Sequence, residues 1–137
     1  MAFGYRRTVP VLRSFDEGKA REFYRDFLGF NIDFEHRFEP GTPLYMQVGR
    51  EGIVFHISEH HGDGSPGVHV RVVMTGVREL HAELTAKRYK NNRPGLDRPE
   101  WGGLEMTVVD PVNNHITFVE AEAEPEAQAS GEQSSTS

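Results

Sequence analysis

The chain has 137 residues, of which 36% are hydrophobic, a formal net charge of −6 at pH 7 and no cysteine. This length suits one domain, and the lack of cysteine excludes disulfides, thiolate nucleophiles and Cys-ligated metals. No apolar run approaches the length of a membrane span, and the N-terminal residues lack the apolar core of a signal peptide. We therefore expect a cytoplasmic protein that does not associate with membranes.

Most of the negative charge lies at the end of the chain, in residues 121–137. The remaining body is close to neutral, so it offers no basic face for nucleic acid. Residues 121–137 contain no large apolar side chain that could offset the entropy of ordering them, which predicts a disordered acidic tail. A tail that recruits a partner protein is a further hypothesis.

The first half of the chain predicts a strand, an amphipathic helix and three more strands. A strand is expected at residues 8–12, and Asp16 is a typical helix N-cap. Apolar residues then recur at helical spacing until Gly29, where the helix should end. This stripe consists of Ala20, Phe23, Tyr24, Phe27 and Leu28. Strands are predicted at 30–35, 44–48 and 53–58, with a turn at 49–52 between the last two.

The second half repeats this order after a glycine-rich linker at residues 62–67. We predict a strand at 68–74, a helix with Leu84 on its apolar face, a short strand near Tyr89, and strands at 104–109 and 115–120. A shift of 61 residues overlays Val9 on Val70 and Phe23 on Leu84.

The repeat predicts an α+β domain over residues 1–120, built from two βαβββ modules at about 8–61 and 67–120. Each module has an apolar face that must be buried against another layer.

Several stretches carry a resemblance to a known family. They are Val-Pro-Val-Leu at 9–12, the helix end Glu-Phe-Tyr-Arg-Asp-Phe-Leu-Gly-Phe at 22–30, Asp-Phe at 33–34, and Trp-Gly-Gly-Leu-Glu-Met-Thr-Val-Val-Asp-Pro at 101–111, followed by His-Ile-Thr-Phe at 115–118. Over residues 8–120 the chain resembles the vicinal-oxygen-chelate superfamily, and within it the bleomycin-resistance proteins. The resemblance implies that each module curls into a concave half-barrel sheet, and that homodimers hold ligands in crevices at the subunit interface.

The same resemblance implies where a divalent metal would sit in the enzymes of this superfamily. Their last-strand carboxylate falls on Thr117 here, and a threonine hydroxyl is a poor ligand for a divalent ion. The first strand offers no ligand either. His56 and His69 fall near the two remaining positions, where they either line a pocket or hold a metal weakly with waters. We expect no metal and no cofactor.

The ligand-binding candidates follow from the match to the resistance proteins. Trp101 lies in a loop beside two glycines, and the resemblance places it against the bound drug, where an indole offers stacking area. The resemblance associates Asp33 and Phe34 with the same groove. The remaining candidates are Phe38, a weaker one, and the pocket-lining His56, His69 and Thr117.

We therefore predict a non-catalytic protein, with no catalytic residue, that sequesters a bleomycin-like antibiotic or an aromatic metabolite in a dimer-interface crevice. The alternative is a metal-dependent lyase, isomerase or transferase of the glyoxalase type. It would use His56 and His69 as ligands and Glu105 or Glu120 as the base.

Overall fold

The structure is a computed structural model that describes residues 2–122, so the predicted acidic tail lies outside the described residues beyond Glu122. It consists of two compact units. Unit 1 comprises Met1–Val70 and Val109–Ile116, and unit 2 comprises Arg71–Val108 and the chain from Thr117 onward. These units do not coincide with the sequence repeats, so the module boundaries 8–61 and 67–120 stay a prediction.

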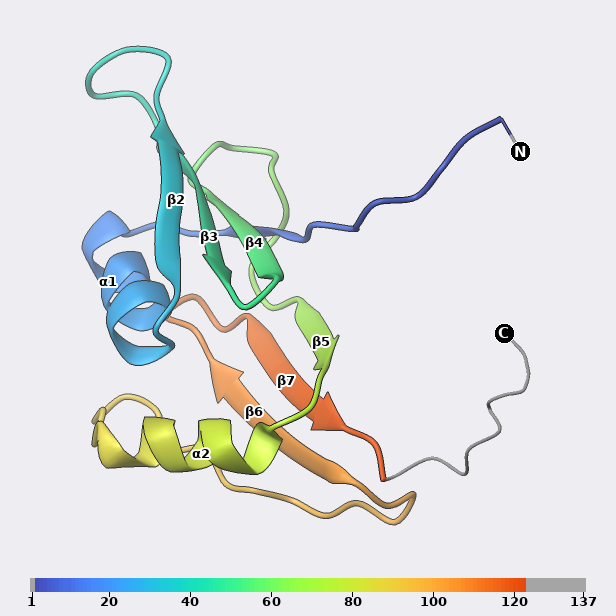
Figure 1. The fold of residues 1–137 in the computed structure, drawn as a ribbon. Coiled ribbons are helices and arrows are strands. Elements are labelled where there is room, and N and C mark those ends of the chain that lie inside the picture. The colour runs from blue at the N-terminus through green and yellow to red at the C-terminus, as the bar shows by residue number, and fades with distance from the viewer. Residues whose placement is uncertain (1, 123–137) are drawn as a thin grey trace. The chain divides into compact units, whose positions relative to one another are not determined.

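Unit 1 contains a four-stranded sheet. Its strands β1 (Val11–Arg13), β2 (Asn31–His36), β3 (Tyr45–Arg50) and β4 (Ile53–Ser58) are arranged in the order β1-β4-β3-β2. The strand β1 is parallel to β4, whereas β2, β3 and β4 form an antiparallel meander. The helix α1 (Glu17–Arg21) and its π-helical continuation η1 (Glu22–Phe27) lie on one side of this sheet (Figure 1).

The predicted helix is present, but its second half has π-helical hydrogen bonds. The Asp16 carboxylate caps the N-terminus by accepting from the Lys19 amide at 3.0 Å, as its residue type predicts. In the π turn the Leu28 amide donates to the Phe23 carbonyl at 2.9 Å. Gly29 ends the helix with φ at 78°, which glycine adopts without strain.

One face of the sheet is buried beneath this helix. Leu12, Met46 and Ile57 form a row across β1, β3 and β4, and none exposes more than 2% of its surface. Phe55 from β4 meets the Tyr24 ring edge-on at 6.3 Å and stacks on Phe30 at 5.5 Å. Strand residues alternate in direction, so the residues between these point to the other face.

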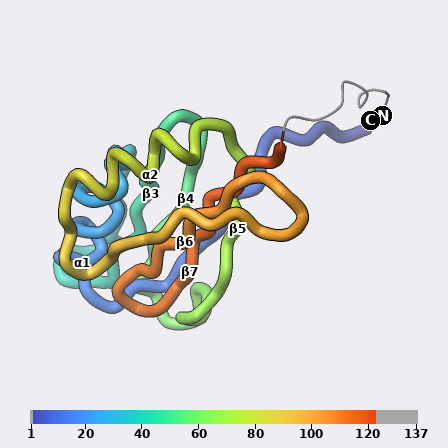
Figure 2. The backbone as a smooth tube through the Cα atoms, turned by 90° about the horizontal axis from the view of Figure 1, so that it is seen from below, coloured from blue at the N-terminus to red at the C-terminus, as the bar shows by residue number. Residues whose placement is uncertain are grey.

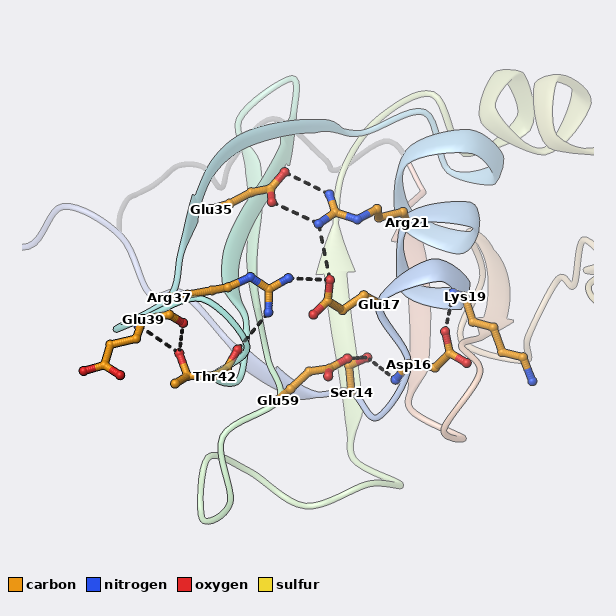
Figure 3. Close-up of polar contacts among 10 residues, drawn as sticks. All are labelled: Ser14, Asp16, Glu17, Lys19, Arg21, Glu35, Arg37, Glu39, Thr42 and Glu59. Atoms are coloured by element: carbon orange, nitrogen blue, oxygen red, sulfur yellow. Dashed lines mark hydrogen bonds and ion pairs between the residues drawn. The ribbon is translucent and has the colours of Figure 1, made fainter.

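Ion pairs connect α1 to β2 and to the loop that follows it (Figure 3). The Arg21 guanidinium donates to both Glu35 carboxylate oxygens at 2.9 Å, and Arg37 donates to Glu17 at 2.6 Å. The hydrogen bonds between Arg21 and Glu35 raise the pKa of the arginine and lower that of the carboxyl. Arg37 also donates to the Thr42 carbonyl at 2.8 Å, which fixes the loop between β2 and β3.

A buried polar cluster fixes the turn at 110–114, within unit 1. The Tyr24 hydroxyl donates to Asp110 at 2.6 Å, and the Asn114 amide donates to the same carboxylate and to the Arg13 carbonyl. The Asn114 side-chain oxygen accepts from the amides of Gly67 and Val68. Burial, followed by the repulsion from Asp110, raises the pKa of Tyr24 well above its usual value.

The second sheet has three strands, β5 (His69–Val73), β6 (Leu104–Val109) and β7 (His115–Glu120), in the order β5-β7-β6. This repeats the order β1-β4-β3 of the first sheet. Unit 2 also contains the helix α2 (Val77–Ala86), after which the chain turns back and runs towards β6 (Figures 1 and 2). Among the described residues, neither helix is long and apolar enough to cross a membrane.

The prediction of a short strand near Tyr89 is wrong. The residues around it form turns and loop, and the pairing that exists is a single bridge between Asp97 and Glu105, with N···O distances of 2.8 and 2.9 Å. The segment after Tyr89 contains Asn91, Asn92, and Pro94 followed by glycine, residue types that favour turns over extended pairing.

Candidate functional site

A chain of hydrogen bonds crosses the face of the unit 1 sheet that points away from the helix. The Tyr45 hydroxyl lies 2.7 Å from Nδ1 of His56, and Nε2 of His56 lies 2.9 Å from the Gln47 side-chain oxygen. The Gln47 amide nitrogen then donates to the Asp33 carboxylate at 2.9 Å. Three strands thus contribute one connected set of polar side chains. We use the name open face for these side chains together with the apolar residues Phe34 and Val11.

The direction of this chain follows from its Asp33 end. An ionised carboxylate only accepts, so the Gln47 nitrogen points to it and the Gln47 oxygen points to His56. That oxygen requires a proton on Nε2 of His56. A neutral ring therefore has its proton on Nε2, and its Nδ1 accepts from the Tyr45 hydroxyl.

The pKa shifts of His56 and Tyr45 agree with this assignment. Burial, and to a smaller extent the positive charge of Arg7, lower the pKa of His56 below its usual value. Burial and the charge of Asp63 raise the pKa of Tyr45. Both shifts keep the side chains neutral near pH 7. The hydrogen bond requires this, because the Tyr45 hydroxyl donates its proton and Nδ1 of His56 accepts it.

An irregularity in β2 brings Asp33 and Phe34 to the same face. Ile32 is opposite Val48 and Phe34 is opposite Gln47, so Asp33 is an extra residue in the pairing. Such a bulge re-aims side chains that would otherwise alternate. The Asp33 carboxylate lies over Gly49, where an added Cβ would stand only 2.6 Å from its oxygen.

The apolar part of the open face is aromatic and exposed. Phe34, Gln47, His56 and Val11 are in register across the four strands. Phe34 exposes 45% of its surface and Val11 exposes 37%. The Phe34 ring meets His56 at 5.7 Å between centroids with the planes at 74°. A planar ligand can therefore stack on an aromatic side chain beside fixed hydrogen-bonding groups.

Of the seven predicted ligand residues, the structure brings Asp33, Phe34 and His56 together on the open face. Phe38 lies in the loop after β2, is 81% exposed, and contacts His36 at 5.9 Å rather than His56. His69 lies beside His115 with a centroid distance of 6.0 Å.

Trp101 and Thr117 belong to unit 2. The Trp101 ring is 52% exposed and lies over Gly103, where an added Cβ would collide with the indole and with the Glu120 carbonyl. Thr117 is buried, and its hydroxyl is hydrogen-bonded to the Thr107 hydroxyl at 2.8 Å.

The residues at the predicted metal positions do not fit a divalent ion. Both nitrogens of His56 are in hydrogen bonds, His69 lies beside a different histidine, and the Thr117 hydroxyl is bound to another hydroxyl. In residues 2–122, no three His, Asp or Glu side chains gather in a group that could hold a metal ion.

Sequence reasoning missed Tyr45 and Gln47, which are central to the open face. Both alternate with the buried Met46 and Val48 in β3, so strand periodicity alone could have placed them on the exposed side. Their position opposite His56 and Phe34 depends on strand register, which a single sequence does not reveal.

The fold and parts of the sequence match known proteins. A family model described as glyoxalase superfamily protein matches residues 1–124. A comparison with curated proteins finds no match.

Among solved structures, a bleomycin-binding protein in complex with bleomycin is 21% identical, with a TM-score of 0.64 over 86% of this chain and 100% of its own. TnmS3, an antibiotic-binding protein from Streptomyces sp. CB03234, is 19% identical, with a TM-score of 0.67 over 89% of this chain and 99% of its own. A glyoxalase-related enzyme from Clostridium phytofermentans is 18% identical, with a TM-score of 0.67 over 88% of this chain and 98% of its own. At these identities the similarity shows the fold, and it confirms the predicted α+β class with two small sheets.

Proposed function

Because the chain belongs to the glyoxalase superfamily, we propose that it binds a small aromatic molecule on the open face and holds it without changing it. The observation that carries this proposal is the exposed Phe34 ring beside the hydrogen-bonded chain from Tyr45 to Asp33. These hydrogen bonds already hold the polar side chains in place, so the side chains lose little conformational entropy when a ligand binds.

The chemical class of the ligand follows from the groups that remain available. Phe34 offers a stacking surface, and within residues 2–122 the Asp33 carboxylate accepts through one oxygen, in the bond from Gln47. The other oxygen can accept from a positively charged or amide donor on the ligand. We propose a planar aromatic antibiotic or metabolite with such a donor, and bleomycin, which one similar structure contains, is the first probe.

We propose Trp101, which belongs to unit 2, as a further stacking surface, separate from the open face. Its ring is half exposed, and the close fit over Gly103 fixes its orientation. A rigid, exposed indole gives contact area at a small entropic cost.

We further propose that the protein forms a homodimer and that the ligand crevice involves both copies. The support is the number of large apolar side chains left exposed, including Val73 at 76% and Tyr5 at 77%, since a symmetric partner could cover such surface. Sedimentation equilibrium of the full chain at several concentrations tests this: a single species with the monomer mass would contradict it.

The binding proposal is tested by calorimetric titration of bleomycin into the wild type and Phe34→Ala. We expect saturable binding by the wild type and an affinity about tenfold lower for the variant, because the stacking surface is lost. Phe15→Ala is the matched control, because Phe15 is also exposed and contacts Arg13 rather than the open face. No saturable binding at tens of micromolar, or equal losses in both variants, would contradict drug binding at this site.

The metal-dependent alternative predicts a different result. A glyoxalase-type enzyme using His56 and His69 must hold a divalent ion, so elemental analysis of protein purified with metal supplementation should show stoichiometric metal that His69→Ala removes. The engaged nitrogens of His56 and the Thr117–Thr107 hydrogen bond favour binding without metal.

A further inference from the structure

Unit 2 contains a cavity of about 480 Å³ that the open face does not involve. It lies between the C-terminal half of α2 and the segment that turns back after it. This volume falls within the range of small-molecule sites in proteins, about 300–1,000 Å³.

Apolar side chains line part of the cavity, and a hydrogen bond connects its two sides. His81 and Leu84 are three residues apart in α2, so they line it from one face of the helix, and Arg88 lines it from just beyond the helix end. Leu84 is buried, and Tyr89 and Pro94 line the cavity from the returning segment. His81 Nε2 lies 3.0 Å from the Pro94 carbonyl oxygen, a hydrogen bond that connects the helix to that segment.

Two arginines place positive charge at this cavity. Arg88 and Arg93 both line it, and both are exposed. In the part of the chain that the structure describes, the ion pair near them joins Lys87 to Glu83, and neither Arg88 nor Arg93 forms one. No acidic side chain lines the cavity. An anionic group that entered it would therefore meet guanidinium groups that are free to pair with it.

The backbone of Arg88 is an independent observation. Its φ is 54°, in the left-handed region that follows many helix ends and that glycine adopts at the least cost. An arginine at this position is sterically strained. A glycine would avoid the strain, but it would have no guanidinium group to bind a ligand. Strained residues of this kind gather at ligand sites.

We propose that this cavity binds a small carboxylate with an apolar, aromatic or branched body. The carboxylate pairs with Arg88 and Arg93, and the body lies on Leu84, Tyr89 and Pro94. This site is separate from the open face and does not depend on the function proposed for it.

The test uses three probes of equal shape and different charge: 2-naphthoate, 2-naphthamide and 2-naphthylmethylammonium. Each is titrated into the full chain and followed by amide chemical shifts in NMR spectra. We expect naphthoate to bind at least tenfold more tightly than the amide, the ammonium to bind weakest, and the shifts to centre on Leu84 and Thr85. Equal affinities for naphthoate and naphthamide, or naphthoate shifts confined to Phe34 and His56, would overturn the proposal.

Substitution of Arg88 separates binding from stability. Arg88→Gly should weaken naphthoate binding at least tenfold while leaving the Tm unchanged or higher, because glycine relieves the left-handed strain. Arg93→Gln should weaken binding as well. Arg98→Gln, which removes an exposed arginine outside the cavity, is the matched control and should bind as the wild type does. Unchanged naphthoate affinity in both Arg88→Gly and Arg93→Gln would overturn the role of the two guanidinium groups.

Discussion

His56 is the residue on which the open face depends, because its two ring nitrogens join the Tyr45 hydroxyl and the Gln47 side-chain oxygen of β3 into one chain of hydrogen bonds. Its residue type suggested a pocket-lining or metal-binding histidine. The sequence could not distinguish these roles, since the answer depends on which groups face the ring across strands. Tyr45 and Gln47 occupy both nitrogens, which leaves the ring as an ordered part of a binding surface.

Protonation of His56 should destabilise the fold. The folded pKa lies below the ordinary value of about 6.5, so the unfolded chain takes up the proton first as the pH falls. The contribution of neutral His56 is complete above the unfolded pKa and is lost as the pH falls towards the folded pKa. Melting temperatures between pH 8 and pH 5 should therefore fall more steeply for the wild type than for His56→Gln. His61→Gln, at an exposed histidine, is the control, and equal slopes for wild type and His56→Gln would refute the assignment.

Replacement of Tyr45 by phenylalanine should raise the pKa of His56. The Tyr45 hydroxyl donates to Nδ1 in the neutral form, and its removal takes away a hydrogen bond that favours that form. The loss should also cost about 1 kcal/mol of unfolding free energy. An NMR titration of the His56 ring protons measures the pKa, and a shift to lower pKa in the variant would contradict the assigned direction of the hydrogen bonds.

At the scale of elements, the turn at 110–114 is fixed by side chains rather than by backbone pairing alone. The sequence predicted the two strands beside it, at 104–109 and 115–120. It did not predict that Tyr24 and the linker residues 67–68 would be bound to the same cluster, because those contacts join segments far apart in sequence.

Removal of the Asn114 side chain should destabilise the protein more than removal of the Tyr24 hydroxyl. Asn114→Ala removes one donor to the Asp110 carboxylate, the side-chain donor to the Arg13 carbonyl and the acceptor for the amides of Gly67 and Val68, whereas Tyr24→Phe removes one donor. We expect losses of about 2–4 and 1–2 kcal/mol, respectively. Chemical denaturation measures both, with Asn91→Ala on the exposed loop as control. An equal or smaller loss for Asn114→Ala would mean that the cluster does not hold the turn.

Gly103 and Gly41 provide a matched pair of substitutions. Both have positive φ, 79° and 89°, but an added Cβ at Gly103 would strike the Trp101 ring and the Glu120 carbonyl, whereas at Gly41 it would meet nothing within 4 Å. Gly41→Ala should cost about 1–2 kcal/mol from backbone strain alone. Gly103→Ala should cost more and should change the Trp101 fluorescence spectrum. Equal costs and an unchanged spectrum would mean that Trp101 does not lie over Gly103.

At the scale of the whole molecule, the sequence predicted most of the strands and both helices, because these segments have clear apolar periodicity. The π turn after Arg21 was missed, since the apolar spacing of Phe23, Tyr24 and Phe27 fits an α-helix as well. The prediction of a strand near Tyr89 was wrong, since a single aromatic residue among charged and turn-forming residues carries little signal.

The candidate site was predicted only in part, for physical reasons. Asp33 and Phe34 would point to opposite faces of a regular strand, and the irregularity in β2 places Phe34 beside His56 and Asp33 beside Gln47 on the same face. The resemblance to resistance proteins selected these residues without that geometry. Tyr45 and Gln47 required the strand register, which comes from long-range pairing.

Ligand binding on the open face is tested most directly by an NMR titration of the ¹⁵N-labelled full chain with bleomycin. Binding there should give saturable chemical-shift changes centred on Phe34, Gln47 and His56, which share one row of the open face. No saturable change at tens of micromolar, or changes that leave these three residues unaffected, would contradict it.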